Sequence, residues 1–120
     1  MQRQDDNKWD PPGGHIDPNE TPAQAAERET YEESGLVVTA CRIVGVLGGR
    51  AIEHCYPNGD KVQPLIVCFA CEVTGGSLQS LDGEAKSFGY FARGSLPELS
   101  TVYPNEILFH QKDDAVYFQP

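Results

Sequence analysis

Residues 14–36 read GHIDPNETPAQAAERETYEESGL, and the first structural element of the chain is predicted from this stretch. Thr21 followed by Pro22 indicates a helix start, because the Thr hydroxyl can accept a hydrogen bond from a free N–H and Pro suits the first helical position. Gln24 completes the spacing of a capping box, and Gly35 suits a left-handed C-terminal cap. We therefore expect a helix from about 22 to 34.

Three carboxylates share one side of this helix. At about 100° per residue, Glu29, Glu32 and Glu33 fall within an arc of roughly 100°. Like charges at this spacing destabilise a bare helix by a few tenths of a kcal/mol per pair. A divalent cation such as Mg²⁺ or Mn²⁺, which takes oxygen ligands, would turn the repulsion into attraction. The alternative for an isolated Glu cluster is an ordinary solvated helix face.

The spacing of the whole stretch favours the cation. It resembles the Nudix box of the MutT-like hydrolases, G-x5-E-x7-R-E-U-x-E-E-x-G-U, where U is a bulky apolar residue. The fixed positions match at Gly14, Glu20, Arg28, Glu29, Glu32, Glu33 and Gly35, with Leu36 at the last U. The other U position holds Thr30, which departs from the pattern. The resemblance implies an enzyme that hydrolyses the pyrophosphate linkage of a nucleoside diphosphate joined to another moiety, with Mg²⁺ or Mn²⁺.

The resemblance also implies roles for individual residues. A backbone carbonyl near Gly14 and the carboxylates of Glu29, Glu32 and Glu33 would bind the metal. Glu20 and Arg28 would form a structural pair that braces the preceding loop against the helix. Many relatives carry one more carboxylate in a later loop, and Glu84 stands at about that place, with Asp82 as the alternative. Catalysis would then depend on Glu29, Glu32, Glu33 and Glu84, with Glu29 or Glu84 as general base.

The composition of the chain indicates its domain number, its kind of partner and its location. A chain of 120 residues with 39% apolar residues is expected to form one domain, 1–120, that buries about two-thirds of its unfolded surface. A net charge of −9 disfavours nonspecific binding to nucleic acid. No apolar run has the length of a membrane span, and no secretory signal opens the chain. With four cysteines read as free thiols, we expect a cytoplasmic protein.

The rest of the chain is expected to be rich in strands. The predicted strands are 36–47, 62–73 and 87–91, the first two joined through the Asn58-Gly59 turn signal. A second helix is predicted from Pro104 to about Lys112. Together with the resemblance, this indicates an α/β (α+β) fold in which a mixed sheet lies between helices.

The N-terminal segment is short for such a fold. Only residues 1–9 precede Asp10, whereas the resemblance implies strands of the central sheet before the box, so the first strands are expected to be missing. A sheet that lacks a strand exposes unpaired N–H and C=O groups. A homodimer formed through the N-terminal side of the sheet, or low stability as a monomer, is the expected consequence.

Two other functions stay open on the sequence alone. One is a non-catalytic module that binds a nucleotide or a partner protein, which loss of the box carboxylates would signal, and none is lost. The other is an acidic domain that binds a structural Ca²⁺. Residues 50–53 lack the Pro or Tyr that marks particular substrates within the family, so no single nucleoside diphosphate derivative is predicted.

Overall fold

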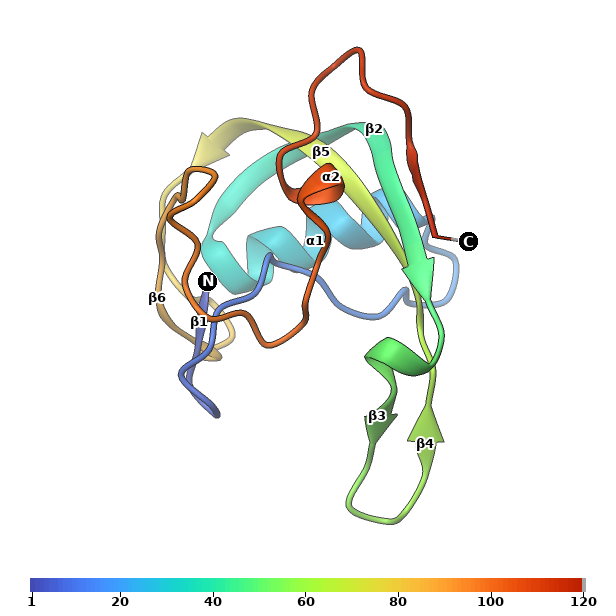
Figure 1. Ribbon diagram of the computed structural model, residues 1–120. Helices are drawn as coiled ribbons and strands as arrows, with labels where there is room; N and C mark the ends of the chain where they lie inside the picture. The colour runs from blue at the N-terminus through green and yellow to red at the C-terminus, as the bar shows by residue number, and fades with distance from the viewer. Residues whose placement is uncertain (120) are drawn as a thin grey trace.

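A computed structural model describes residues 1–119. The elements in chain order are β1 (Gln2–Arg3), α1 (Pro22–Ser34), β2 (Leu36–Gly48), η1 (Arg50–Ile52), β3 (His54–Cys55), β4 (Lys61–Val62), β5 (Leu65–Gly76), β6 (Ala85–Ser87), α2 (Asn105–Leu108) and β7 (Tyr117–Phe118). Within residues 1–119 the strands form three sheets, with orders β5-β2-β7, β1-β6 and β3-β4. Helix α1 lies behind the long β2–β5 pair, and the β3–β4 hairpin projects away from the body (Figure 1).

Helix α1 begins and ends where the sequence predicts. The Thr21 hydroxyl accepts a hydrogen bond from Gln24 N at 3.1 Å, and the Gln24 side chain accepts one from Thr21 N at 2.9 Å. At the other end Gly35 is left-handed, with φ +76°. Thr30, the departure from the box pattern, bonds its hydroxyl to Ala26 O at 2.7 Å, so its polar group needs no other partner.

The long hairpin supplies the framework on which the helix packs. Strand β2 pairs antiparallel with β5 from Leu36↔Gly76 to Gly48↔Leu65, with irregularities that bend the pair. The C-terminal β7 adds to the other edge of β2 in parallel register. Behind the sheet, the Glu27 side chain accepts a hydrogen bond from Ala40 N at 2.8 Å and so fastens α1 to β2.

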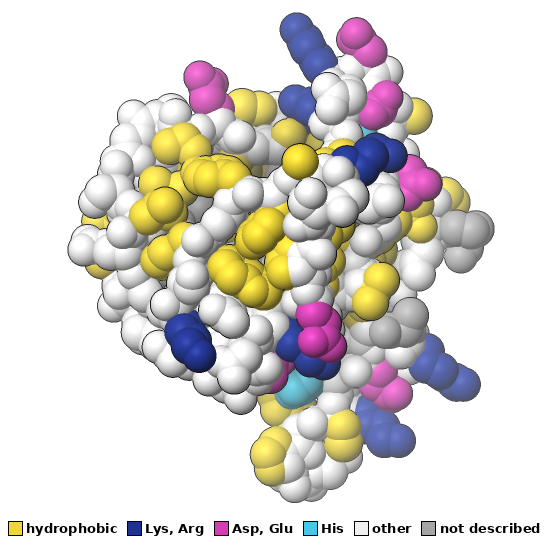
Figure 2. Space-filling view, turned by 60° about the vertical axis from the view of Figure 1, so that its left-hand side comes forward, with side chains coloured by type: hydrophobic (Ala, Val, Ile, Leu, Met, Phe, Trp, Pro, Cys, Tyr) yellow, Lys and Arg dark blue, Asp and Glu magenta, His cyan; other side chains and the backbone are white. Residues whose placement is uncertain are grey.

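The buried core is small and lies between the sheet and α2. Val44 and Leu47 of β2 pack with Ile107 of α2, with Tyr103 and Tyr117 partly buried against them. Gly45 makes the close approach possible, since a Cβ there would stand 2.5 Å from Ile107 Cγ1. Apolar side chains also gather on the surface around hollows, as Figure 2 shows for one face.

Three predicted elements differ from the structure. The strand predicted at 87–91 occupies only Ala85–Ser87, because its partner β1 has two residues; Phe91 instead packs edge-on against Trp9 with ring centroids 5.0 Å apart. The predicted second arm 62–73 is divided at Pro64 into β4 and β5. The second helix starts after Pro104 as expected but ends at Leu108, because Phe109 has non-helical dihedrals (φ −119°, ψ 31°).

Candidate metal and diphosphate site

The loop before α1 is held by a fully occupied guanidinium. Arg28 donates from Nε and Nη2 to the two oxygens of Glu20, at 2.7 and 3.0 Å. It also donates from Nη2 to His15 O at 2.9 Å, and from Nη1 to Glu29 at 2.9 Å and to Glu32 at 3.1 Å. A guanidinium has five N–H groups, so Arg28 has none left for a substrate. This arrangement suits a brace between loop and helix.

The Glu20–Arg28 contact predicts a specific pH dependence of stability. The Arg28 guanidinium lowers the pKa of Glu20 below its ordinary value of 4.5. A lowered folded-state pKa contributes stability above pH 4.5, which is lost as the pH falls through the folded pKa. The difference in melting temperature between the wild type and Glu20→Gln should therefore be largest near pH 7 and shrink toward pH 3.

Glu98→Gln is the matched control for this experiment. Glu98 forms a 3.6 Å ion pair with Lys8, but its side chain is 77% exposed, so solvent screens the pair. This variant should track the wild type at every pH. A constant offset for Glu20→Gln between pH 7 and pH 3 would contradict the assigned charge contact.

Backbone hydrogen bonds join the C-terminal end of α1 to a loop that is distant in the sequence. The last carbonyls of a helix lack partners within the helix. Here Ser34 O accepts a hydrogen bond from Gln79 N at 2.9 Å, and Glu32 O accepts from Leu81 N at 3.0 Å and Asp82 N at 3.2 Å. These bonds bring the 79–84 loop against the acidic side of the helix.

The loop completes a cluster of carboxylates. Oxygen atoms of Glu33, Asp82 and Glu84 all lie within 4.8 Å of one another. Glu33 is buried, 5% exposed, and accepts a hydrogen bond from Gly13 N at 2.9 Å. Burial, together with the nearby charges of Glu29, Asp82 and Glu84, raises the pKa of Glu33 to about 7. A buried carboxylate that neighbouring negative charges repel in this way is stabilised by a cation beside it.

The other predicted residues surround this cluster. Glu29, Glu32 and Gly14 line the same hollow of about 760 Å³ as Glu33, Asp82 and Glu84. Glu29 lies directly over Gly14, where a Cβ would meet its carboxylate oxygens at 2.5 and 2.7 Å. Glu29 and Glu32 differ from Glu33 in that both contact Arg28. The predicted Gly14, Glu29, Glu32, Glu33 and Glu84 thus line one hollow. Of the three carboxylates predicted to bind the metal, Glu33 converges with Asp82 and Glu84, whereas Glu29 and Glu32 lie beside that cluster.

These donors fit a hard divalent cation. The three clustered groups are carboxylates, which suit Mg²⁺, Mn²⁺ or Ca²⁺, and they include neither the thiolate nor the imidazole ligands that favour softer metals. Within residues 1–119, no other group of three His, Cys, Asp or Glu side chains converges in this way.

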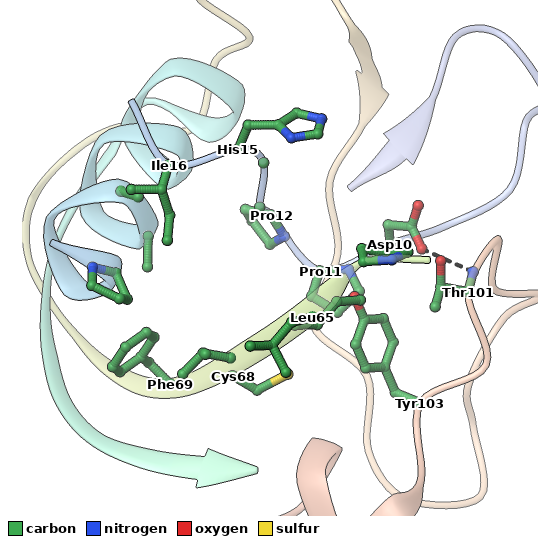
Figure 3. Close-up of a pocket in the computed structure, with 18 of the residues that line it drawn as sticks. Asp10, Pro11, Pro12, His15, Ile16, Leu65, Cys68, Phe69, Thr101 and Tyr103 are labelled. Carbon is green, nitrogen blue, oxygen red and sulfur yellow. Dashed lines mark hydrogen bonds between the residues drawn. The ribbon is translucent and has the colours of Figure 1, made fainter. Parts of the chain in front are cut away.

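A second, more apolar hollow adjoins the carboxylates. It has a volume of about 680 Å³ and shares the segment Asp10–His15 as a wall with the first. Ile16, Leu65, Phe69 and Tyr103 point into it from the loop before α1, from β5 and from the segment before α2 (Figure 3). Its rim is fixed by Asp10, which accepts a hydrogen bond from Thr101 N at 3.2 Å. The two hollows together form a polar compartment beside an apolar one.

The fold and the site together define an α+β domain with a cluster of carboxylates, suited to a divalent cation, at the end of its main helix. Comparison with known proteins identifies its family. The model of the NUDIX domain matches residues 1–111, and the chain therefore belongs to the NUDIX domain family. This membership confirms the resemblance read from residues 14–36 and the predicted fold class.

Similar proteins include several diphosphatases. The chain is 32% identical over 89 residues to an ADP-ribose pyrophosphatase of Methanocaldococcus jannaschii, covering 74% of this chain and 48% of that protein. It is 31% identical over 97 residues to a putative 8-oxo-dGTP diphosphatase of Bacillus subtilis, covering 81% and 58%. The chain thus spans about half the length of these relatives.

A solved structure shares the fold. The crystal structure of a UDP-X diphosphatase aligns with a TM-score of 0.77 at 22% identity, over 98% of this chain and 58% of that one. At this identity the likeness concerns the fold alone. No helix among residues 1–119 has the length and apolar character needed to cross a membrane.

Proposed function

We propose that this chain is a metal-dependent pyrophosphohydrolase that cleaves the pyrophosphate linkage of a nucleoside diphosphate joined to another moiety. The observation that carries the proposal is the meeting of Glu33, at the end of α1, with Asp82 and Glu84 from a loop about fifty residues later in the chain. The relatives named ADP-ribose pyrophosphatase and putative 8-oxo-dGTP diphosphatase support this reaction class. We infer a single catalytic domain over 1–120.

The chain's own residues supply positioning and proton transfer. Glu33, Asp82 and Glu84, with Glu29, Glu32 and the Gly14 carbonyl beside them, would hold one or more Mg²⁺ or Mn²⁺ ions. A bound divalent cation supplies Lewis-acid stabilisation of the charge that develops on the diphosphate oxygens. Glu29 or Glu84 would take a proton from the attacking water, since both line the hollow that would contain it. Glu20 and Arg28 would keep the loop with Gly14 in place.

The apolar hollow would bind the second moiety of the substrate. It adjoins the carboxylates through the wall Asp10–His15 and contains Phe69 and Tyr103, whose rings suit a base or another flat group. This placement favours a small-molecule substrate over nucleic acid, which the acidic charge of the chain also opposes.

Chromatographic separation of the products over a panel of nucleotides tests the proposal, because cleavage of the pyrophosphate linkage yields a nucleotide and a second phosphorylated product rather than free phosphate. The panel contains ADP-ribose, UDP-sugars, dinucleoside polyphosphates and nucleoside triphosphates. Each nucleotide is supplied at roughly millimolar concentration, near the upper end of usual KM values. Each is tested with excess Mg²⁺ and again with excess chelator. We expect a nucleoside monophosphate to form from one class of nucleoside diphosphate derivative with Mg²⁺, and no cleavage with chelator. A protein that binds a nucleotide without cleaving it would support the non-catalytic alternative.

Self-association stays a prediction. Among the described residues β5 pairs with β2 on one edge alone, and the apolar hollow lies beside it, so this side of the sheet has groups that a second copy could satisfy. Light scattering at micromolar concentration should report a dimer. A stable, well-folded monomer would contradict it and would show that another segment covers the free edge of β5. A cytoplasmic location, which the four free cysteines favour, is likewise proposed.

A further inference from the structure

Arg3 is placed beside the carboxylate cluster by the pairing of β1 with β6. Arg3 lies opposite Ala85 in the antiparallel register, and Ala85 follows Glu84 directly. The next residue, Gln4, donates its backbone N–H to Glu84 O at 3.1 Å. The same short ladder therefore positions the loop that completes the cluster and the guanidinium next to it.

Charge makes Arg3 unusual in this hollow. Among the described residues, it is the one Lys or Arg side chain that lines the compartment. The carboxylates that line it are Asp5, Asp10, Glu29, Glu32, Glu33, Asp82 and Glu84. A diphosphate that enters beside a cation held by the cluster meets this guanidinium as the remaining positive side chain. Arginine matches phosphate geometry with paired N–H groups, which a carboxylate-bound metal does not replace.

The hydrogen bonds of Arg3 leave donors for such a contact. Nε and Nη2 donate to Asp5, and Nη1 donates to Asp10 at 3.3 Å. Of the five N–H groups, one on Nη1 and one on Nη2 have no partner among the described residues. Arg28 by contrast uses all five. The two arginines thus differ: all the N–H groups of Arg28 are hydrogen-bonded within the described residues, whereas two N–H groups of Arg3 remain available to a ligand.

The tethers also fix the guanidinium before a ligand arrives. Asp10, whose side chain is 14% exposed, is itself held by Thr101 N. A side chain ordered in advance loses less conformational entropy on binding. If Arg3 served only to hold the turn formed by residues 3 to 10, it would have the same hydrogen bonds, but it would have no effect on the affinity for an anion.

We infer that Arg3 binds the diphosphate of the substrate, donating its Nη1–H and Nη2–H to phosphate oxygens that the cation does not hold. The inference rests on the proposed function and adds to it a residue that sets affinity for the diphosphate group, outside the 14–36 stretch. It leaves proton transfer to the carboxylates.

Titration calorimetry with imidodiphosphate, a diphosphate analogue with a stable bridge, tests the inference in excess Mg²⁺. Arg3→Gln is expected to weaken binding about 10- to 100-fold, since it removes charge-assisted hydrogen bonds. Arg3→Lys retains the charge without the paired N–H groups and should fall between wild type and Arg3→Gln. Lys86→Gln is the matched control: it removes the same charge from the neighbouring strand, where Lys86 bonds Asn7 and does not line the hollow.

The readouts separate the inference from its alternatives. Mn²⁺ binding by the Arg3 variants should equal that of the wild type, and the loss should appear in KM more than in kcat if the contact is made equally in ground and transition states. A brace alone would lower the melting temperature and leave the imidodiphosphate affinity of the folded protein unchanged, which would overturn the inference. If Arg3→Gln does not fold, wild-type affinity in Arg3→Lys overturns it equally. A wild type that binds no imidodiphosphate and hydrolyses no nucleotide would contradict the proposed function as well.

Discussion

Replacing Glu33 with Gln is expected to lower the rate of hydrolysis at least about a hundredfold. Even the loss of a residue that only supports a metal ligand lowers metal affinity or activity about 10- to 100-fold. The Gln amide oxygen can still accept the hydrogen bond from Gly13 N, so the loop keeps its anchor. The side chain loses the charge that a cation needs, and it also loses the cost of burying a carboxylate whose pKa is raised. The variant should therefore fold as well as the wild type without metal.

Two measurements check this prediction. The rate of substrate cleavage should fall in Glu33→Gln and stay at the wild-type rate in Glu53→Gln, which changes an exposed carboxylate outside the hollow. Melting curves should show that Mg²⁺ stabilises the wild type, by about 2.7 kcal/mol at one hundred times its dissociation constant, and stabilises Glu33→Gln much less. Full activity in Glu33→Gln would remove Glu33 from the metal site.

A methyl group at Gly14 is expected to abolish most of the activity with little effect on folding. The added Cβ would overlap the Glu29 carboxylate, which is the mobile end of a long side chain and can rotate away. Displacement of Glu29 costs little stability, but it removes an oxygen donor from the site and disturbs its 2.9 Å contact with Arg28. A misplaced catalytic group of this kind costs on the order of a hundredfold in rate.

Gly13→Ala provides the neighbouring control. A Cβ at Gly13 would meet no atom of the described residues within 4 Å, and the hydrogen bond from Gly13 N to the Glu33 carboxylate is retained. We expect wild-type rates for Gly13→Ala, a rate lowered about a hundredfold for Gly14→Ala, and melting temperatures within a few degrees for all three proteins. Equal rates in the two variants would show that the position of Glu29 over Gly14 has no part in catalysis.

The local features of the site could be predicted from sequence because they depend on near neighbours in the chain. The Thr21–Gln24 capping box and the Gly35 cap fix the ends of α1, and helical geometry alone then places Glu29, Glu32 and Glu33 on one side. Arg28 and Glu20 are eight residues apart, within reach of a helix and the loop before it. The strands were less predictable, since Ser87–Phe91 and Val62–Val73 depend on partners that the sequence does not specify.

The helix, its caps and its acidic face can be predicted without the fold, because they follow from interactions over a few residues. Which carboxylates converge depends instead on long-range contacts of the folded chain. Glu33 is joined by Asp82 and Glu84 because the carbonyls of Glu32 and Ser34 at the helix end take hydrogen bonds from the 79–82 segment. Arg3 likewise reaches the site only through the pairing of β1 with β6, across more than eighty residues of chain. Such long-range pairings depend on how unsatisfied backbone groups find partners in three dimensions, and no local pattern records them.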